Sequence, residues 1–368
     1  MPSCCQAARL LCATARFPFP AALPILLALA AACGRGDSIP RDDTSYLVYP
    51  GREIQPALEA AAADPARKTV KVHAGTYRPQ RPGQAMIWFN ARHDGITLEA
   101  AGEVVLTAAN PDIADPEADT FPAVVNHVVY FGDGVTANTV LRGFEVTGAN
   151  HFVTHLEEPE DIQPHSEDVI WKKGMFFYTD GGGIKIFGRP YPTIDRVVVR
   201  DNYTSPCGGG VSIEHRGFND REVVFTDCIF RDNRCQVTGS AVDVLAGSAA
   251  VFENCLFVGN VSNTGVDYIG RRDGYEYNVE HGSGALTVFP NSRVEVRSCT
   301  FTGNWNGADD KGTGSVYTRS IFWRNNLRGG ISPGHRYELD ILDGAGVSGC
   351  FINGEIEDLR GTLNPEAN

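Results

Sequence analysis

Apolar and polar residues alternate in short runs along most of the chain, and the runs recur. DCIFRDN (227–233), NCLFVGN (254–260) and SCTFTGN (298–304) share one frame, with phenylalanine two residues after a cysteine and asparagine five after it. SIFWRN (320–325) keeps this frame with serine in the cysteine place, and RVVVRDN (196–202) keeps it with valines. Alternation with period two predicts a short strand in which the cysteine and phenylalanine positions point inward.

A second recurring element precedes several of these copies. GGGIKI (181–186), GGGVSI (208–213), GSAVDV (239–244) and GSGALTV (282–288) are each a small-residue turn followed by an alternating strand. The unit is therefore strand, turn, strand and asparagine turn. A unit this short cannot bury its apolar face alone, so it has to stack on copies of itself. Stacking predicts parallel sheets with rungs about 4.8 Å apart.

Stacked copies place equivalent residues in ladders along the coil. We expect amide side chains to bond along one ladder and apolar groups to pack along two others. The cysteine position accepts phenylalanine, valine and serine as well, which favours an inward packing role over a metal ligand or a nucleophile. The ladders are Asn202, Asn233, Asn260, Asn304 and Asn325; Val199, Phe230, Phe257, Phe301 and Phe322; and Phe144, Val197, Cys228, Cys255, Cys299 and Ser320.

The segment before the repeats predicts a helix. Ile54, Leu58 and Ala61 or Ala62 form one apolar stripe at helical spacing. A helix there would cap the open end of the coil and cover an otherwise exposed sheet edge.

With these features the sequence resembles right-handed parallel β-helix repeat proteins of the pectate-lyase-like superfamily, over roughly residues 46 to 350. The resemblance implies an all-β fold, a right-handed parallel β-helix (single-stranded solenoid) with an N-terminal capping helix. It leaves the activity open, because the superfamily holds lyases, hydrolases, epimerases and adhesins. The catalytic motif series of polygalacturonases is missing apart from the fragments Asp309-Asp310 and Gly334-His335, and so is the Asp-Pro-His-Asp run of alginate epimerases.

The first residues predict export. An apolar stretch of signal-peptide length follows Arg16 and ends in small residues before Cys33, much like the site at which bacterial lipoproteins are acylated. We expect a signal peptide (1–32), a tether (33–45) and the β-helix (46–368). The expected location is the outer membrane or cell surface, otherwise the periplasm or the medium, with membrane contact only through a lipid on Cys33.

Charge narrows the range of partners. The formal net charge of −13 disfavours nucleic acid, which requires clustered lysine and arginine. A polysaccharide remains compatible with this charge, and we expect a monomer. The better disulfide candidate is Cys207 with Cys235, because both lie in asparagine-turn loops of neighbouring rungs, and Cys228 with Cys255 is the alternative because adjacent rungs bring them near bonding range.

Candidate chemistry lies on the outward face of the glycine-preceded strands. Alternation places Lys185, Ser212, Asp243 and Thr287 in one column facing solvent, and Phe187, Glu214, Leu245 and Phe289 in the next. Two long loops (151–180 and 264–283) leave from the same corner and should wall these columns. The candidate catalytic residues are Lys185, Glu214, Asp243, Arg271 and Arg272, and the candidate sugar-binding residues are Phe187, Trp171, Tyr268 and Phe289.

Three functions compete for this face. The first is polysaccharide binding, with rings stacking on sugars and charged groups bonding hydroxyls. The second is a polysaccharide lyase, with a lysine or arginine base and calcium, or a hydrolase using the carboxylates of Glu214 and Asp243. The third is a structural or adhesive surface protein. No metal site is predicted, because the histidines show no ligand spacing, and no cofactor can be assigned beyond calcium for a uronate lyase.

Overall fold

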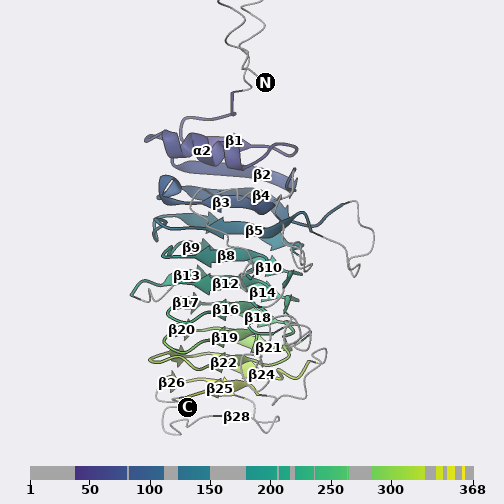
Figure 1. Ribbon diagram of the computed structural model, residues 1–368, viewed down its shortest axis with the longest axis vertical. Coiled ribbons are helices and arrows are strands. Elements are labelled where there is room, and N and C mark those ends of the chain that lie inside the picture. The colour runs from purple at the N-terminus through teal and green to yellow at the C-terminus, as the bar shows by residue number, and fades with distance from the viewer. Residues whose placement is uncertain are drawn as a thin grey trace, which may run out of the picture. The chain divides into compact units, whose positions relative to one another are not determined.

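The computed structural model describes residues 38–80, 83–111, 123–149, 180–204, 207–215, 220–235, 237–262, 264, 284–327, 337–342, 346–352 and 359–360. The chain divides into two compact units, Met1–Ser38 and Ile39–Asn368. Apart from Ser38, the first unit lies outside the described residues, and with it the signal peptide and Cys33. The second unit is a right-handed parallel β-helix in which short strands stack in rungs (Figure 1).

Two long sheets form the walls of the coil. The nine-stranded sheet contains the glycine-preceded strands, and the seventeen-stranded sheet contains the repeats with cysteine and phenylalanine. The first consists of β3 (Gly83–Phe89), β5 (Val125–Phe131), β8 (Ile184–Phe187), β12 (Val211–Glu214), β16 (Val242–Val244), β19 (Leu286–Val288), β22 (Ala308–Asp310), β25 (Leu339–Ile341) and β28 (Leu359–Arg360).

The seventeen-stranded sheet pairs each strand with its equivalent in the next rung, in parallel, as Phe230 with Phe257 and Phe257 with Phe301. Its strands are β1 (Ser45–Val48), β2 (Thr69–Tyr77), β4 (Thr97–Thr107), β6 (Val140–Arg142), β7 (Glu145–Thr147), β9 (Thr193–Asp195), β10 (Val198–Arg200), β13 (Val223–Thr226), β14 (Ile229–Arg231), β17 (Ala249–Glu253), β18 (Leu256–Val258), β20 (Arg293–Arg297), β21 (Thr300–Thr302), β23 (Val316–Thr318), β24 (Ile321–Trp323), β26 (Val347–Ser348) and β27 (Phe351–Ile352). A separate pair is formed by β11 (Tyr203–Thr204) and β15 (Arg234–Cys235).

Single residues in left-handed conformation make the corners of the coil. Asp227 (φ 55°) separates β13 from β14, and Asn254 (φ 54°) does the same in the next rung. Asp232 (φ 55°) then bends the chain immediately before Asn233. Aspartate and asparagine tolerate this conformation better than most residues, because their short polar side chains bond locally.

The predicted asparagine ladder is confirmed. Asn233 Nδ2 donates to Asn260 Oδ1 (3.1 Å) and to the Val199 carbonyl of the preceding rung (2.9 Å). The same bonds recur from Asn202 to Asn325, and all five amides are buried. Glu338 ends the ladder by accepting from the backbone N–H of Asn325. The ladder therefore satisfies buried backbone groups at one corner of the rungs from Asn202 to Asn325.

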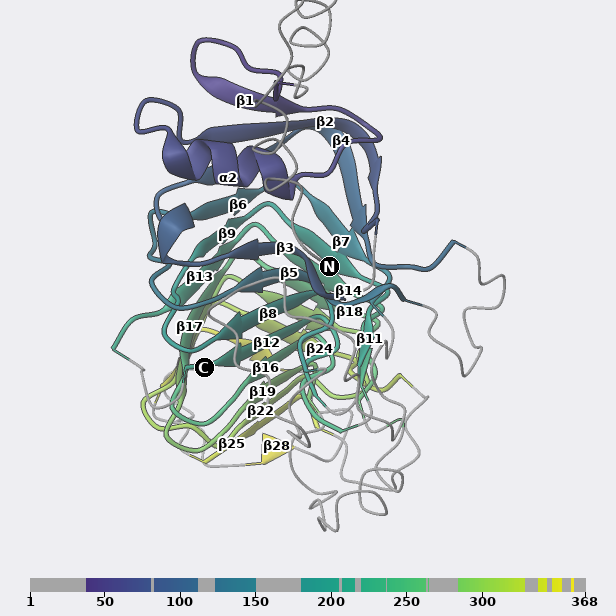
Figure 2. The same ribbon diagram turned by 45° about the horizontal axis from the view of Figure 1, so that its top comes forward.

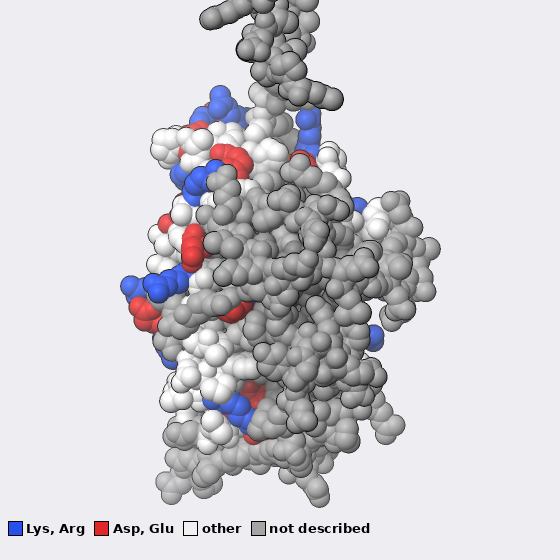
Figure 3. All heavy atoms as spheres, viewed as in Figure 1, with Lys and Arg blue, Asp and Glu red and all other residues white. Residues whose placement is uncertain are grey.

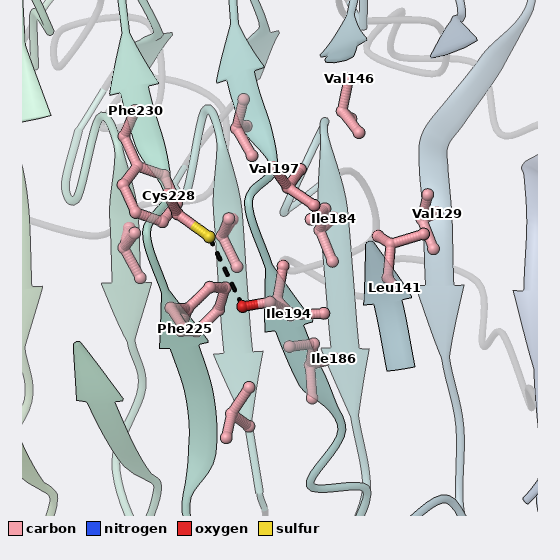
Figure 4. Packing of buried hydrophobic residues seen from close by; sticks show 14 of the residues in the cluster. Val129, Leu141, Val146, Ile184, Ile186, Ile194, Val197, Phe225, Cys228 and Phe230 are labelled. Atoms are coloured by element: carbon pink, nitrogen blue, oxygen red, sulfur yellow. Dashed lines mark hydrogen bonds between the residues drawn. The ribbon is translucent and has the colours of Figure 1, made fainter. Parts of the chain in front are cut away.

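The predicted inward ladders are also confirmed. Phe257 stacks on Phe301 with ring centroids 4.2 Å apart, and Phe301 on Phe322 at 4.6 Å. Cys228 points into the core beside Phe225 and Phe230 and bonds the Ile194 carbonyl, with sulfur and oxygen 3.5 Å apart (Figure 4). These cysteines form no disulfide. The position therefore serves packing, as the mixture of residue types in this ladder indicates.

A helix, α2 (Gln55–Ala63), forms where the apolar stripe predicts one and buries Ala57, Leu58 and Ala61. Figure 2 shows α2 beside β2 and β3 at the N-terminal end of the coil, and the short η1 (Ala91–His93) contacts α2. Its role as a cap stays a prediction. Within the ranges given above, none of the helices has the length and apolar character needed to cross a membrane.

Candidate functional site

The outward column of the nine-stranded sheet has the predicted register. Lys185 pairs with Ser212, Ser212 with Asp243, and Asp243 with Thr287. The column extends further in both directions than the repeats indicate, because the flanking strands carry polar and aromatic residues at the same position. The full column is Trp88, Tyr130, Lys185, Ser212, Asp243, Thr287, Asp309, Asp340 and Arg360.

The prediction that this column faces solvent is wrong at its centre. Lys185, Ser212 and Asp243 are 0% exposed, and Glu214 in the next column is 6% exposed. Alternation fixes only the side of the strand on which a residue lies, and other segments decide whether water reaches it. The charged candidates are therefore groups in a dry environment, where each needs a partner.

A second column faces the first from the turns before the strands. The backbone N–H of Gly181 donates to the Cys207 carbonyl, and that of Gly208 to the Thr238 carbonyl, so Asp180, Cys207 and Thr238 occupy equivalent positions. The glycine that follows each of them has positive φ (80°, 63° and 61°). A Cβ on Gly239 would lie 2.6 Å from Asp243 Cβ, so only glycine permits this close approach.

Lys185 connects the two columns. Its ammonium lies 3.3 Å from Asp180 Oδ2, 3.2 Å from Ser212 Oγ and 3.3 Å from Glu214 Oε2. Ser212 Oγ donates to Asp180 Oδ2 at 2.6 Å. Burial lowers the pKa of Lys185, but the carboxylates of Asp180 and Glu214 outweigh burial and leave this pKa above its ordinary value. Lys185 is therefore an ammonium at neutral pH, which suits charge compensation and argues against a role as general base.

The pKa values of Asp180 and Asp243 are also raised, which for a carboxyl group favours the neutral form. Burial raises the pKa of Asp180 to about 6, against the lowering effect of Lys185 and Ser212. Burial, followed by the charge of Asp180, raises the pKa of Asp243 well above its ordinary value. His127, one rung nearer the N-terminus, bonds the Gly181 carbonyl through Nδ1 at 2.8 Å. Burial and then Lys185 lower the pKa of His127 to about 3.

The predicted disulfide between Cys207 and Cys235 is not formed, since both are free and fully buried. The reason is register: Thr204 is the partner of Cys235 in the β11–β15 pair, whereas Cys207 is equivalent to Thr238. Cys235 Sγ instead bonds the Thr238 carbonyl at 3.1 Å. Burial raises the pKa of both thiols.

A second charged cluster lies further along the same column. Lys311 Nζ is 2.8 Å from Asp340 Oδ1 and 3.3 Å from Asp309 Oδ1. Tyr337 donates its hydroxyl to Asp309 Oδ2 at 3.2 Å. One lysine thus bridges the carboxylates of two adjacent rungs.

The N-terminal end of the column borders a cavity of about 470 Å³. Half-buried Trp88 lines it, and the Gln55 side chain holds Trp88 by bonding both its backbone N–H (3.0 Å) and its carbonyl (3.1 Å). Arg52, Arg78, Glu53 and Glu59 also line the cavity. Figure 3 shows basic and acidic side chains close together at this end of the unit.

An aromatic cluster connects this cavity to the charged cluster. Ala85 and Tyr130 are buried on the outward face, with Trp88 and Phe187 packed against them. The Lys185 ammonium lies 5.7 Å from the centroid of the Phe187 ring. Aromatic and charged groups thus form one continuous row across β3, β5, β8 and β12, in which Trp88 and Phe187 are half-buried and Tyr130 and Lys185 are buried.

The remaining predicted residues divide into two groups. Phe187 and Phe289 are half-buried on described strands or their ends. Trp171, Tyr268, Arg271 and Arg272 lie outside the described residues, as do the two long loops except Asp180 and Thr264. For these residues the sequence-based expectation stays a prediction.

Sequence reasoning missed Asp180, Cys207 and Thr238. The signal was present, because each stands immediately before the small-residue turn that marks the strand (DGGG, CGGG and TGSA). Aligning that position across copies would have shown a polar ladder opposite Lys185, Ser212 and Asp243. Trp88 and Tyr130 were missed because the first rungs lack the repeat frame.

Comparisons with known proteins agree with the architecture without placing the site. A family model described as "right handed beta helix region" matches residues 161–281. The crystal structure of pectate lyase Pel9A is similar with a TM-score of 0.43 and 16% identity, covering 90% of this chain and 74% of that chain. The catalytic domain of a GH87 α-1,3-glucanase, in complex with tetrasaccharides, has a TM-score of 0.29 and 10% identity, covering 88% of this chain and 68% of that chain. No curated protein matches the chain.

Proposed function

We propose that the protein binds polysaccharide along the outward face of the nine-stranded sheet, with the cavity at Trp88 receiving a sugar ring. The observation that carries this proposal is the cavity lined by half-buried Trp88, with a second half-buried ring, Phe187, packed against the same buried cluster of Ala85 and Tyr130. Aromatic rings stack on the apolar faces of sugars, and carboxylates and guanidinium groups bond their hydroxyls. The cavity offers both kinds of group.

The dimensions of the coil are compatible with a chain-like ligand. Trp88 and Lys185 are two rungs apart in one column, which corresponds to about 10 Å at the usual strand spacing. A linear glycan running along the coil from Trp88 on β3 would reach the half-buried ring of Phe187 on β8. This arrangement favours an extended polymer over a compact small molecule.

A polysaccharide lyase or glycoside hydrolase acting at the same face is the second candidate. The carboxyl groups of Asp180, Glu214 and Asp243 gathered around Lys185 favour it. The complete burial of Asp180, Lys185 and Asp243 favours binding over catalysis, because a reacting group has to touch its substrate.

The test is retention of the purified full chain on polysaccharides. We expect slower migration through gels that contain uronate-rich or neutral polysaccharide than through gels without glycan. Unsaturated ends detected by ultraviolet absorbance would identify a lyase, and new reducing ends without them a hydrolase. Absence of retention on every glycan of the panel would contradict the proposal.

We also propose that residues 1–32 export the protein and that Cys33 is acylated. The small residues before Cys33 support this. The protein should then sediment with membranes, and Cys33→Ser should release it into the soluble exported fraction. Equal sedimentation of both forms would refute acylation at Cys33.

A further inference from the structure

Asp180, Cys207 and Asp243 come from three successive rungs and meet at one buried place. Each offers one ligand atom, two carboxylate oxygens and one sulfur, and these atoms lie within 4.8 Å of one another. All three residues are 0% exposed. Metal–oxygen and metal–sulfur bonds of about 2.0–2.3 Å bring ligand atoms to similar mutual distances around one ion, so small side-chain rotations suffice to enclose it.

The two carboxylates are held in the manner of metal ligands. Asp180 Oδ2 accepts from Ser212 Oγ at 2.6 Å and from Lys185 at 3.3 Å, and Asp243 Oδ2 accepts from Thr238 Oγ1 at 3.2 Å. The other oxygen of each, Oδ1, is buried without an N–H or O–H donor among the described residues, and the Cys207 thiol interacts with the Asp243 carboxylate. Outer hydrogen bonds of this kind orient ligating carboxylates, whereas a buried oxygen without a partner is costly.

Charge supports the same conclusion. Asp180, Glu214 and Asp243 supply three carboxylates and Lys185 one ammonium, which leaves two negative charges when all four are ionised. Lys185 bonds Asp180 and Glu214 but does not lie within ion-pairing distance of Asp243. A divalent cation between Asp180 and Asp243 would offset this excess, and with the Cys207 thiolate counted about one negative charge remains in this buried place.

We propose that Asp180, Cys207 and Asp243 bind a divalent, thiol-seeking metal ion, with zinc the best match. Calcium and magnesium take oxygen ligands, whereas zinc accepts sulfur and carboxylate oxygen together. The metal–sulfur bond forms as the thiol of Cys207 loses its proton to solvent. Three protein ligands leave one position of a tetrahedral ion open to water or another ligand. This site goes beyond the proposed glycan binding and does not depend on it.

The test uses the full chain, produced in medium supplemented with cobalt or zinc because the site is closed in the folded protein. We expect about one metal ion per chain, and for cobalt a thiolate-to-metal charge-transfer band in the near ultraviolet. Cys207→Ser should abolish the band and lower the metal content at least tenfold. Cys235→Ser, which removes an equally buried thiol of a neighbouring turn, should keep both.

The outcomes separate the site from other thiols of the chain. A band that survives Cys207→Ser, or protein without metal after both supplements, would overturn the proposal. Should Cys207→Ser fail to fold, judged by far-ultraviolet circular dichroism, the isosteric Asp243→Asn replaces it and should lower the metal content by the same order. Retention on glycan gels is measured separately, so loss of one property does not imply loss of the other.

Discussion

Two clusters on one column of the nine-stranded sheet each surround a lysine with carboxylates, but they differ in the number of carboxylates per lysine. The cluster of Lys311 has two carboxylates, Asp309 and Asp340, both contacting the lysine. The cluster of Lys185 has three, and Lys185 bonds only Asp180 and Glu214. It also includes a thiol, and its lysine is 0% exposed against 16% for the side chain of Lys311.

The difference indicates different roles. In the Lys311 cluster, one ammonium between two carboxylates on adjacent rungs is what stacking of charged strands requires for stability. In the Lys185 cluster, a third carboxyl group, Asp243, lies buried beside a thiol and outside ion-pairing distance of the lysine, and burial raises its pKa. Groups perturbed in this way are concentrated at functional sites. We therefore interpret the first cluster as structural and the second as the proposed metal site.

The largest effect should come from Lys185→Met. This change leaves Asp180 and Glu214 buried without their cation, which typically costs about 3–5 kcal/mol. Urea unfolding of the metal-free protein measures this loss in the free energy of unfolding. The double variant Lys185→Met/Glu214→Gln should recover part of the loss, and a single variant as stable as the original would show that the cluster is not a charge network.

Lys311→Met should cost less, about 2 kcal/mol, because water reaches part of this side chain and screens the remaining carboxylates. The same urea series compares the two variants directly. A loss equal to or greater than that of Lys185→Met would contradict the distinction between the clusters.

A smaller effect, about 1.4 kcal/mol between pH 6.5 and pH 5.5, should mark His127, which lies beside Tyr130 and is influenced by Lys185. Its folded pKa of about 3 is below the ordinary 6.5, so the fold favours the neutral ring. Its contribution is complete above pH 6.5 and is lost as the pH falls toward 3, at about 1.4 kcal/mol per pH unit in that window. Relative to His127→Gln, the original protein should lose stability more steeply below pH 6. Parallel pH profiles of unfolding free energy would contradict this.

Much of the fold could be predicted from sequence because the repeat is local. Asn260 and Phe257 recur at fixed offsets from Cys255, so stacking alone gives their ladders. The register of Lys185, Ser212 and Asp243 followed from the same alignment. Glu338 as the end of the asparagine ladder could not be predicted, because it lies outside the repeat frame.

The site was predicted less completely because its essential properties are non-local. Alternation assigns Asp243 to the outward side, but its burial depends on segments from other parts of the chain. Cys207 and Cys235 look equivalent when only turns are counted, whereas pairing shows that Cys207 is equivalent to Thr238. A metal site assembled from one residue per rung shows no short spacing motif, which is why Asp180 was missed.

The proposed glycan surface is tested most directly by comparing two tryptophans on the two sheets. Trp88 lines the cavity of the nine-stranded sheet, and Trp323 is 42% exposed on the seventeen-stranded sheet. Affinity electrophoresis of the full chain, with the polysaccharide that retains it best, measures the binding constant of each variant. We expect Trp88→Ala to weaken binding at least tenfold and Trp323→Ala to leave it unchanged. Equal binding by both variants, or loss only in Trp323→Ala, would contradict the account.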